Sequence, residues 1–458
     1  MGKIDLSQGN IRKLVIRTAI PMVAAQLVSM LYNIVDRIFV GRIPDIGAVA
    51  LGGIGIYLPI NIIFMAVSLL FGGGGAPQAS IALGSGEHKK AEEYLGCCIA
   101  PLVVCGIAFS LCLYLGGEKI LPLFGATEGN ITYSLEYVRI ICIGVPFSML
   151  ITGLNIFINT QGKTLIGMVS VTLGAVVNIV LDAVFILGMN MGVAGAAWAT
   201  VIGQVASAVW IIGFLSSGRS AIRIRSHNLI PDLKMLWSIV ALGISNFITT
   251  GAESVVNIIL NYSLKKYGMS AYTGYALDGA TLAITAGTIV TTTSSFIRLP
   301  VNGFSQGLQP VISYNYGAGK HDRVRQAIRF SMLATTVYAA VLWLFMMAVP
   351  GTFARVFTDS ADVAGISGSL IRVYVFGMIF SGIQSTLIQS FIARGMKKYS
   401  LMVSLACKGL YVPFLLVLPA IASPAYSVMA IYAAQAVTDV LAVVFIAVLY
   451  RRTGNIAA

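Results

Sequence analysis

Charge, histidine and paired cysteine are all scarce in this sequence. Charged residues make up 10% of the 458 residues, whereas an ordinary globular protein has about 25%. Hydrophobic residues reach 57%, and the mean hydropathy is +0.87. A chain this apolar cannot cover itself with a water-facing surface, so the composition argues against soluble domains and predicts an integral membrane protein.

The residues that usually build catalytic centres are too few and too scattered to do so here. The three histidines, His88, His227 and His321, fall in expected loops, and the six cysteines form no C-x-x-C motif. Neither H-E-x-x-H nor G-x-x-x-x-G-K-[ST] is present. The four glycines at 72–75 are interpreted as a helix end or as a close approach of helices. We therefore expect neither an enzyme nor a bound cofactor.

Long apolar runs are what the sequence does have. A helix needs about 20 apolar residues to cross a bilayer. Because twelve is an even number, both termini should lie on one side of the membrane. The N-terminus lacks the apolar core of a signal peptide, so the first run should remain as a membrane helix. The twelve candidate spans are 16–40, 48–74, 93–116, 134–157, 165–187, 194–216, 236–262, 275–300, 326–349, 366–390, 401–421 and 427–449.

The basic residues predict which side that is. The net charge is +13, and 20 Lys and Arg residues fall in the termini and in the loops on their side, against 6 in the opposite loops. Basic residues accumulate in cytoplasmic loops. We therefore expect both termini in the cytoplasm, a location in the cell inner (cytoplasmic) membrane, and no nucleic-acid partner.

An internal repeat divides the chain. The segment GSGEHKKAEEYL at 84–95 resembles GAGKHDRVRQAI at 317–328, and the offset of 233 residues recurs over some eighty residues. Each half holds six spans, so both halves start on the same side and the repeat is parallel. We predict an all-α integral membrane fold of twelve helices in two six-helix lobes. The expected boundaries are 1–215 for the N-lobe, 216–234 for a cytoplasmic linker and 235–458 for the C-lobe.

Two carboxylates stand inside apolar runs of the first half, where they are costly and are functional candidates by default. Asp36 and Asp182 lie at a similar depth from the outer end of their spans. Asn33 shares a helix face with Asp36, Asn178 shares one with Asp182, and Thr200 enters the next span at about the same depth. This oxygen-rich set suits a proton or a hard cation such as Na⁺. The alternative is a polar network that only holds helices together.

The second half does not repeat this set. Glu253 lies in the middle of the seventh span with Asn257 one turn later, and these two residues, together with Asn33, are the candidates for binding a cationic substrate. A hydrogen bond between helices explains Glu253 equally well. Asp278 and Asp439 are further intramembrane candidates without an assigned role.

Pro21 lies fifteen residues before Asp36 in the first span. A proline inside a helix frees a carbonyl group and allows the helix to bend there. A bendable helix that carries a titratable carboxylate is an arrangement expected of a switch, so Pro21 is a candidate hinge.

Three segments together resemble the multidrug and toxic compound extrusion (MATE) transporters. They are YNIVDRIFVGR after Pro21, NIVLDAVFI followed by MGVAGAAWAT, and GFSQGLQPVISYNYGAGKHDRVRQA. The resemblance implies two lobes around a central V-shaped cavity and export of organic cations and other amphipathic compounds against inward H⁺ or Na⁺ flow. It also implies a cation site, and some family members use a glutamate that Glu253 resembles. The cation site would be formed by Asp36, Asn178, Asp182 and Thr200.

The function expected from the resemblance is thus a cation-coupled antiporter for amphipathic, chiefly cationic, compounds. Its expected partners are small molecules and the lipid bilayer, and we expect a monomer. The alternative is a flippase for a lipid-linked or other amphipathic metabolite. Flippases usually line the cavity with several arginines, whereas Arg139 and Arg372 lie near span ends here. An integral-membrane enzyme would need a clustered His, Asp or Cys site, which the sequence lacks.

Overall fold

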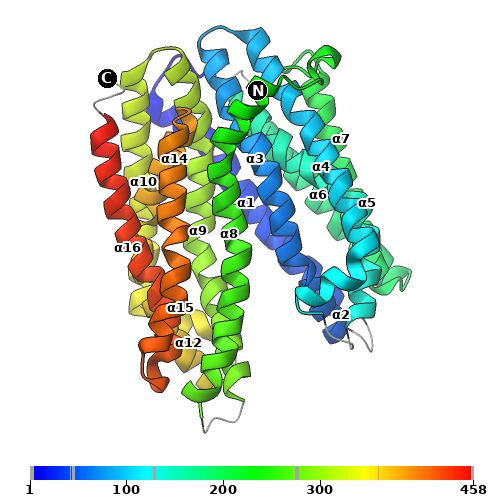
Figure 1. Ribbon diagram of the computed structural model, residues 1–458, viewed down its shortest axis with the longest axis vertical. Helices are drawn as coiled ribbons and strands as arrows, with labels where there is room; N and C mark the ends of the chain where they lie inside the picture. Colours follow the sequence, from blue (N-terminus) through cyan, green and yellow to red (C-terminus); the bar gives the residue numbers. More distant parts are fainter. Residues whose placement is uncertain are drawn as a thin grey trace.

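The computed structural model describes residues 5–41, 43, 47–126, 130–273, 278–358 and 360–454. Over these ranges the chain is helical and contains no strand. Twelve of its helical segments are long and apolar enough to cross a membrane, and they run roughly side by side along the long axis of the molecule (Figure 1). The expected all-α fold with twelve spans is confirmed.

The first six spans begin near the N-terminus and end before the polar segment around 217–232. The fifth span continues from α6 through a π-helical segment, Ala183–Gly188. The helices are α1 (Ile11–Gly41), α2 (Gly47–Gly55), α3 (Tyr57–Gly84), α4 (His88–Leu123), α5 (Ile131–Thr160), α6 (Thr164–Asp182) and α7 (Gly192–Ser216).

The last six spans are more often interrupted. A 3₁₀ segment, Phe376–Phe380, joins α12 to α13 within one span, and a π-helical segment, Leu405–Gly409, joins α14 to α15 within the next. The helices are α8 (Leu233–Ala271), α9 (Gly279–Gly317), α10 (His321–Ala348), α11 (Pro350–Arg355), α12 (Ala361–Val375), α13 (Ser381–Ala393), α14 (Lys397–Ser404), α15 (Tyr411–Ile421) and α16 (Ser427–Gly454).

One of the two interpretations of the four glycines at 72–75 was that they end a helix, and it is wrong. They lie buried inside α3, which continues to Gly84, so the expected end of the second span at residue 74 is wrong. A Cβ on Gly72 would collide with the backbone of Gly153, and one on Gly74 with the backbone oxygen of Ile239. The glycines thus allow close helix packing, and the hydrogen bonds of α3 pass through them.

The two halves meet along α3, which packs on α8 and α9, and along α1, which packs on α9. The contact between α3 and α9 is reciprocal. A Cβ on Gly84 would collide with the backbone oxygen of Tyr314, and one on Gly317 with that of Ile81. The repeat offset of 233 residues relates Gly84 to Gly317, and it also relates Ile81 to Tyr314. The repeat therefore describes a symmetric contact in space as well as a similarity in sequence.

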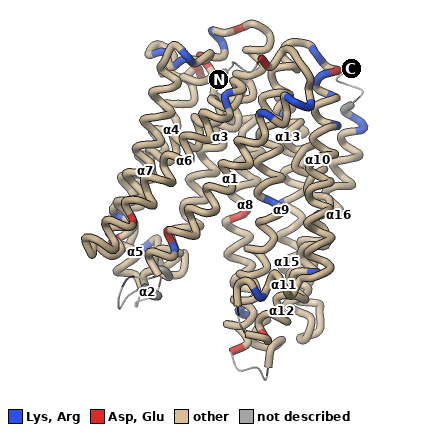
Figure 2. The backbone as a smooth tube through the Cα atoms, turned by 180° about the vertical axis from the view of Figure 1, so that it is seen from behind, with Lys and Arg blue, Asp and Glu red and all other residues tan. Residues whose placement is uncertain are grey.

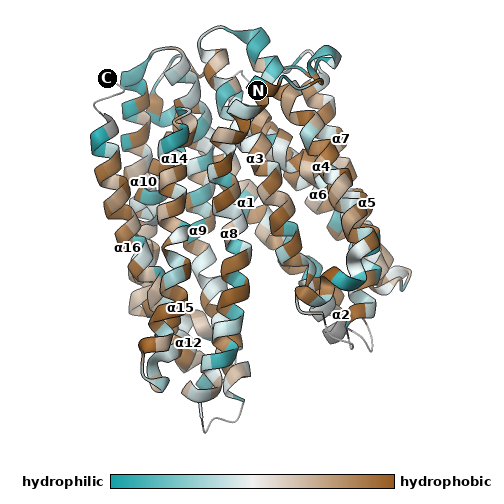
Figure 3. Cartoon of the chain, viewed as in Figure 1, coloured by the Kyte–Doolittle hydropathy of each residue, from teal (hydrophilic) through white to brown (hydrophobic). Residues whose placement is uncertain are grey.

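Charge and hydropathy divide the molecule along its length. The two termini lie at one end (Figure 1), and Lys and Arg residues gather at that end (Figure 2). Hydrophobic residues cover the middle of the helices, whereas hydrophilic residues concentrate toward the end with the termini (Figure 3). The two groups of helices diverge toward the opposite end, where α2 and α12 lie apart (Figure 1).

Candidate functional site

A cavity of about 990 Å³ is lined by residues of both halves of the chain. Its wall is mixed: asparagine, glutamine, serine and threonine side chains alternate with apolar ones. The central cavity expected for the fold is thus present. The charged residues that line it are Asp36, Arg37, Glu253, Arg298, Lys408 and Asp439.

On the first-half wall the structure brings the four expected cation-site residues together. The side-chain amide of Asn178 (Nδ2) donates a hydrogen bond to the Thr200 hydroxyl (Oγ1) at 3.2 Å. The carboxyl groups of Asp36 and Asp182 adjoin each other. Asp36 lines the cavity, whereas Asp182 is fully buried behind it. Asp36 and Asp182, which were expected at a similar depth, therefore also lie close together in space. That the four residues bind a cation stays a prediction.

Four buried oxygens of this pocket have no hydrogen-bond donor among the described residues. Within the part of the chain that the structure describes, no hydrogen-bond donor reaches Oδ1 of Asp36, either carboxylate oxygen of Asp182, or Oδ1 of Asn178. Buried polar atoms are normally paired, and an unpaired one costs about 1–3 kcal/mol. Four such acceptors in one place favour a ligand that can be shared between oxygens, such as a proton or a hard cation.

Two tyrosines belong to this pocket and were missed by sequence reasoning. Tyr32 from α1 and Tyr137 from α5 both line the cavity, as Thr200 does. Tyr32 lies one helical turn before Asp36 and so shares its face, a spacing that could have revealed it. Nothing in the sequence indicates that Tyr137 joins the pocket, because its position depends on how α5 packs against α7.

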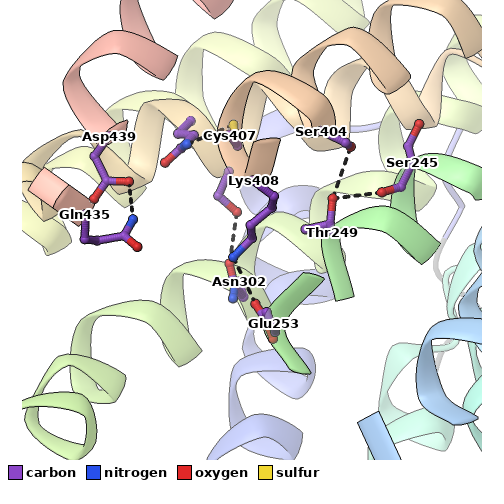
Figure 4. Close-up of polar contacts among 11 residues, drawn as sticks. Ser245, Thr249, Glu253, Asn302, Ser404, Cys407, Lys408, Gln435 and Asp439 are labelled. Carbon is purple, nitrogen blue, oxygen red and sulfur yellow. Dashed lines mark hydrogen bonds and ion pairs between the residues drawn. The ribbon is translucent and has the colours of Figure 1, made fainter. Parts of the chain in front are cut away.

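On the second-half wall the expected carboxylate has a partner of opposite charge. Nζ of Lys408 lies 3.3 Å from Oε1 of Glu253, and Figure 4 shows the two side chains pointing toward each other. Glu253 therefore does not stand alone as a site for a cationic substrate. The ion pair links α8 to the π-helical segment Leu405–Gly409. Glu253 therefore makes a contact between helices, as the alternative interpretation held.

Asp439 of α16 and Arg298 of α9 complete this wall. Asp439 is 8% exposed, lines the cavity and accepts a hydrogen bond through Oδ1 from Nε2 of Gln435 at 2.7 Å (Figure 4). Arg298 also lines the cavity. Sequence reasoning missed both Lys408 and Arg298 as site residues, although a cation inside an apolar run is a signal of function.

The remaining candidates divide between the cavity and other parts of the fold. Asn33 lines the cavity and donates through Nδ2 to the backbone oxygen of Ser29 at 2.6 Å. Asn257 is exposed and does not line the cavity, so the structure does not place it at the site with Glu253. Asp278 caps the N-terminus of α9, accepting from the backbone N–H of Thr281 at 3.2 Å.

Pro21 lies inside α1, which runs unbroken from Ile11 to Gly41. Around it α1 packs closely on α9. A Cβ on Gly303 would crowd the backbone of Val23, and one on Gly307 would collide with Ala19. The candidate hinge is therefore located in the contact between the two halves, where a bend in α1 would change that contact.

Comparison with known proteins decides the family. The MatE family model matches residues 21–184 and 247–417. The chain belongs to the MATE family. The multidrug export protein MepA of Staphylococcus haemolyticus is 23% identical over 411 residues, which cover 90% of this chain and 88% of that protein.

Solved structures of MATE-type transporters have the same fold. One described as an outward-facing multidrug resistance MATE transporter of the MOP superfamily matches with a TM-score of 0.87 at 19% identity, covering 100% of this chain and 99% of that chain. A MOP superfamily transporter from Pyrococcus furiosus, whose binding pocket is described as having reverse polarity, matches with a TM-score of 0.88 at 18% identity and the same coverage. The expected family and fold are confirmed by these matches.

Proposed function

We propose that this chain exports amphipathic small molecules across the cell membrane in exchange for a cation that moves inward, either H⁺ or Na⁺. The observation that carries the proposal is the group of four donor-free buried oxygens contributed by Asp36, Asp182 and Asn178. Family membership and the similarity to a multidrug export protein support the export of small molecules. A monomer suffices for this function, because one chain supplies both walls of the cavity.

The carboxylate pair supplies the driving force for ion binding. Two negative charges about 4 Å apart repel each other by roughly 4 kcal/mol at the effective dielectric constant of a protein surface. In this pocket the described residues offer no donor to three of the four carboxylate oxygens. A proton shared between Asp36 and Asp182, or an Na⁺ ion held by both with Asn178 and Thr200, removes the repulsion. The pocket is therefore more stable with the ion than without it.

Helix α1 couples this ion to the cavity. Asp36 is part of α1, and the same helix packs on α9 around Pro21. Neutralising Asp36 changes the hydrogen bonds that its carboxyl group makes, which favours a different position of α1 and a narrower cavity. Because coupling between two binding sites is reciprocal, the ion and the exported compound weaken each other's binding.

The cavity suits drug-sized amphiphiles. Its volume of about 990 Å³ lies at the upper end of the range of about 300–1,000 Å³ usual for small-molecule pockets. The carboxylates of the first-half wall favour compounds that carry a protonated amine. With the basic end of the molecule (Figure 2) placed in the cytoplasm, both termini are cytoplasmic and the halves diverge toward the outside.

The test is efflux of a fluorescent amphiphile from proteoliposomes in which the pH gradient and the Na⁺ gradient are imposed separately. We expect one of the two gradients to drive efflux, and the other to have no effect once the first is clamped. Dye movement that follows its own concentration gradient whatever the ion gradients would refute the antiport proposal.

A flippase for a lipid-linked metabolite is the second candidate. Few basic residues were expected inside the membrane, yet Arg298 and Lys408 both line the cavity. The same proteoliposomes distinguish the two functions if a fluorescent phospholipid is added to the bilayer. A flippase translocates this lipid between the leaflets, whereas a drug antiporter does not.

A further inference from the structure

The second-half wall of the cavity holds two cations as well as two carboxylates. Glu253, Arg298, Lys408 and Asp439 all line the cavity. The charges of Arg298 and Lys408 both act on Glu253 and on Asp439, so the four groups form one electrostatic cluster. We call this set the charged wall. Its formal charge is zero, whereas the pocket around Asp36 and Asp182 is acidic.

Lys408 lines the cavity from a local irregularity in its helix. It lies in the π-helical segment Leu405–Gly409, between α14 and α15. A π-helical turn holds one more residue than an α-helical turn, rotates the following side chains, and is frequent at functional sites. The side chain of Lys408 is 20% exposed, and that of Glu253 is 46% exposed. Lys408 is thus held by Glu253 and still accessible from the cavity.

Arg298 is the more available of the two cations. It lies on α9 two residues before Pro300, and its side chain is exposed and lines the cavity. Among the residues that the structure describes, Arg298 makes no hydrogen bond or ion pair. A guanidinium group presents its donors in a planar fork that matches carboxylate, sulfonate and phosphate groups. An arginine that lines a cavity and makes no direct hydrogen bond or ion pair with a described residue therefore favours an anionic ligand.

We propose that Arg298 and Lys408 form an anion-binding subsite for exported amphiphiles that carry a carboxylate, sulfonate or phosphate group. Arg298 makes the primary contact, and Lys408 adds a second when Glu253 turns to an amine of the same compound. A zwitterion then exchanges the protein's internal ion pair for two pairs with the ligand, and no charge is left unpaired. The inference rests on the proposed export function for its physiological meaning, but the subsite itself can be tested by binding alone.

A matched pair of dyes isolates the anionic group. Rhodamine B carries a free carboxylate beside its delocalised cation, and its ethyl ester differs only by masking that carboxylate. We measure binding of each dye to the purified full-length protein in detergent without added lipid or ion gradient. The wild-type protein should bind rhodamine B about tenfold more tightly than the ester, because the ester leaves Arg298 without a partner.

The variants assign the preference to the subsite. Arg298→Gln should abolish the preference by weakening rhodamine B about tenfold while leaving the ester unchanged. Arg298→Lys, which keeps the charge and loses the fork, should retain part of it. Arg355→Gln, the same substitution at an exposed arginine of α11 outside the cavity, is the matched control and should behave as wild type. Thermal unfolding of each variant shows that it is folded.

Several outcomes would overturn the subsite. Equal weakening of both dyes by Arg298→Gln would assign the arginine to structure, and a wild-type protein without a preference would remove the anionic ligand. Competition of rhodamine B by added phosphatidylglycerol in wild type but not in Arg298→Gln would assign the subsite to a lipid phosphate instead of an exported compound. Failure of gradient-driven efflux with the binding preference intact would refute the proposed antiport and leave the subsite standing.

Discussion

The two walls of the cavity hold carboxylates in opposite electrostatic settings. On the first-half wall, Asp36 and Asp182 face each other, and three of their four oxygens have no donor among the described residues. On the second-half wall, Glu253 has Lys408 at 3.3 Å and Asp439 has Gln435 at 2.7 Å. The first wall therefore holds two adjoining carboxylates with oxygens that no donor reaches among the described residues, whereas each carboxylate of the second wall has a partner. This contrast is the structural basis for our proposal of ion coupling in the first half and compound selection in the second.

The local reason for the difference lies in the corresponding spans of the two halves. In the first half, the π-helical segment Ala183–Gly188 follows Asp182 at the end of α6. In the second half, the π-helical segment Leu405–Gly409 comes earlier in the repeat and brings a lysine to the cavity. The equivalent spans of the two halves therefore present a carboxylate near the cavity in one half and a lysine in the other.

Asp36→Asn should have the largest effect on the comparison, because it removes one of the two adjoining carboxylates of the first wall. We expect a folded protein in which ion-driven efflux falls to the level of protein-free liposomes. Asp439→Asn, the same substitution on the other wall, should keep the coupling. The measurement is gradient-driven efflux, with thermal stability of both purified variants as the control for folding. Normal coupling in Asp36→Asn would mean that the two walls do not differ in this way.

Glu253→Gln should act on the second wall without changing the ion dependence. The substitution leaves Lys408 without its partner, which for a partly exposed pair should cost about 1–2 kcal/mol of stability. It should also weaken organic cations about tenfold more than neutral compounds. Both can be measured on the purified protein, by thermal unfolding and by dye binding.

The double variant Glu253→Gln with Lys408→Met sharpens that result. Removing both partners of a pair is nearly neutral, so the double variant should regain the stability that Glu253→Gln loses. A double variant that is less stable than either single one would show that Lys408 has another partner.

Thr200→Val should have a smaller effect, confined to the first wall. It removes the hydroxyl that accepts the 3.2 Å hydrogen bond from Asn178, a loss of about 1 kcal/mol or roughly fivefold in the apparent affinity for the coupling cation. Thr249→Val makes the same change on the second wall, where Thr249 bonds to Ser404 at 3.1 Å (Figure 4). The ion dependence of efflux should shift only in Thr200→Val; equal shifts would argue against a division of labour.

The smallest effect on transport is expected from single cysteine substitutions, which should leave transport unchanged. Labelling these cysteines tests on which side of the membrane the cavity opens. In a background with Cys112→Ser, which removes the exposed native cysteine, Gln8→Cys and Arg452→Cys should react only from the cytoplasm. Lys119→Cys, at the opposite end of α4, should react from outside. The reverse pattern would invert the proposed direction of transport.

Sequence reasoning predicted the first wall more fully than the second. Asp36, Asp182, Asn178 and Thr200 could be placed at one depth because an α-helix rises by a constant 1.5 Å per residue. Depth alone could not relate Glu253 to Lys408, since their contact depends on how α8 packs against the segment Leu405–Gly409. Neither the joining of the pocket by Tyr137 nor the exposure of Asn257 follows from spacing within one helix.

The sequence by itself determined the all-helical membrane fold, its twelve spans, the parallel repeat and the resemblance to MATE transporters. These follow from composition, run length and offset, which are properties of the chain read in one dimension. Only the tertiary structure decided how the glycines of α3 are used, which carboxylates meet and which are compensated. Those outcomes depend on how each helix is rotated about its axis and which neighbour it packs against, and packing between distant segments sets both.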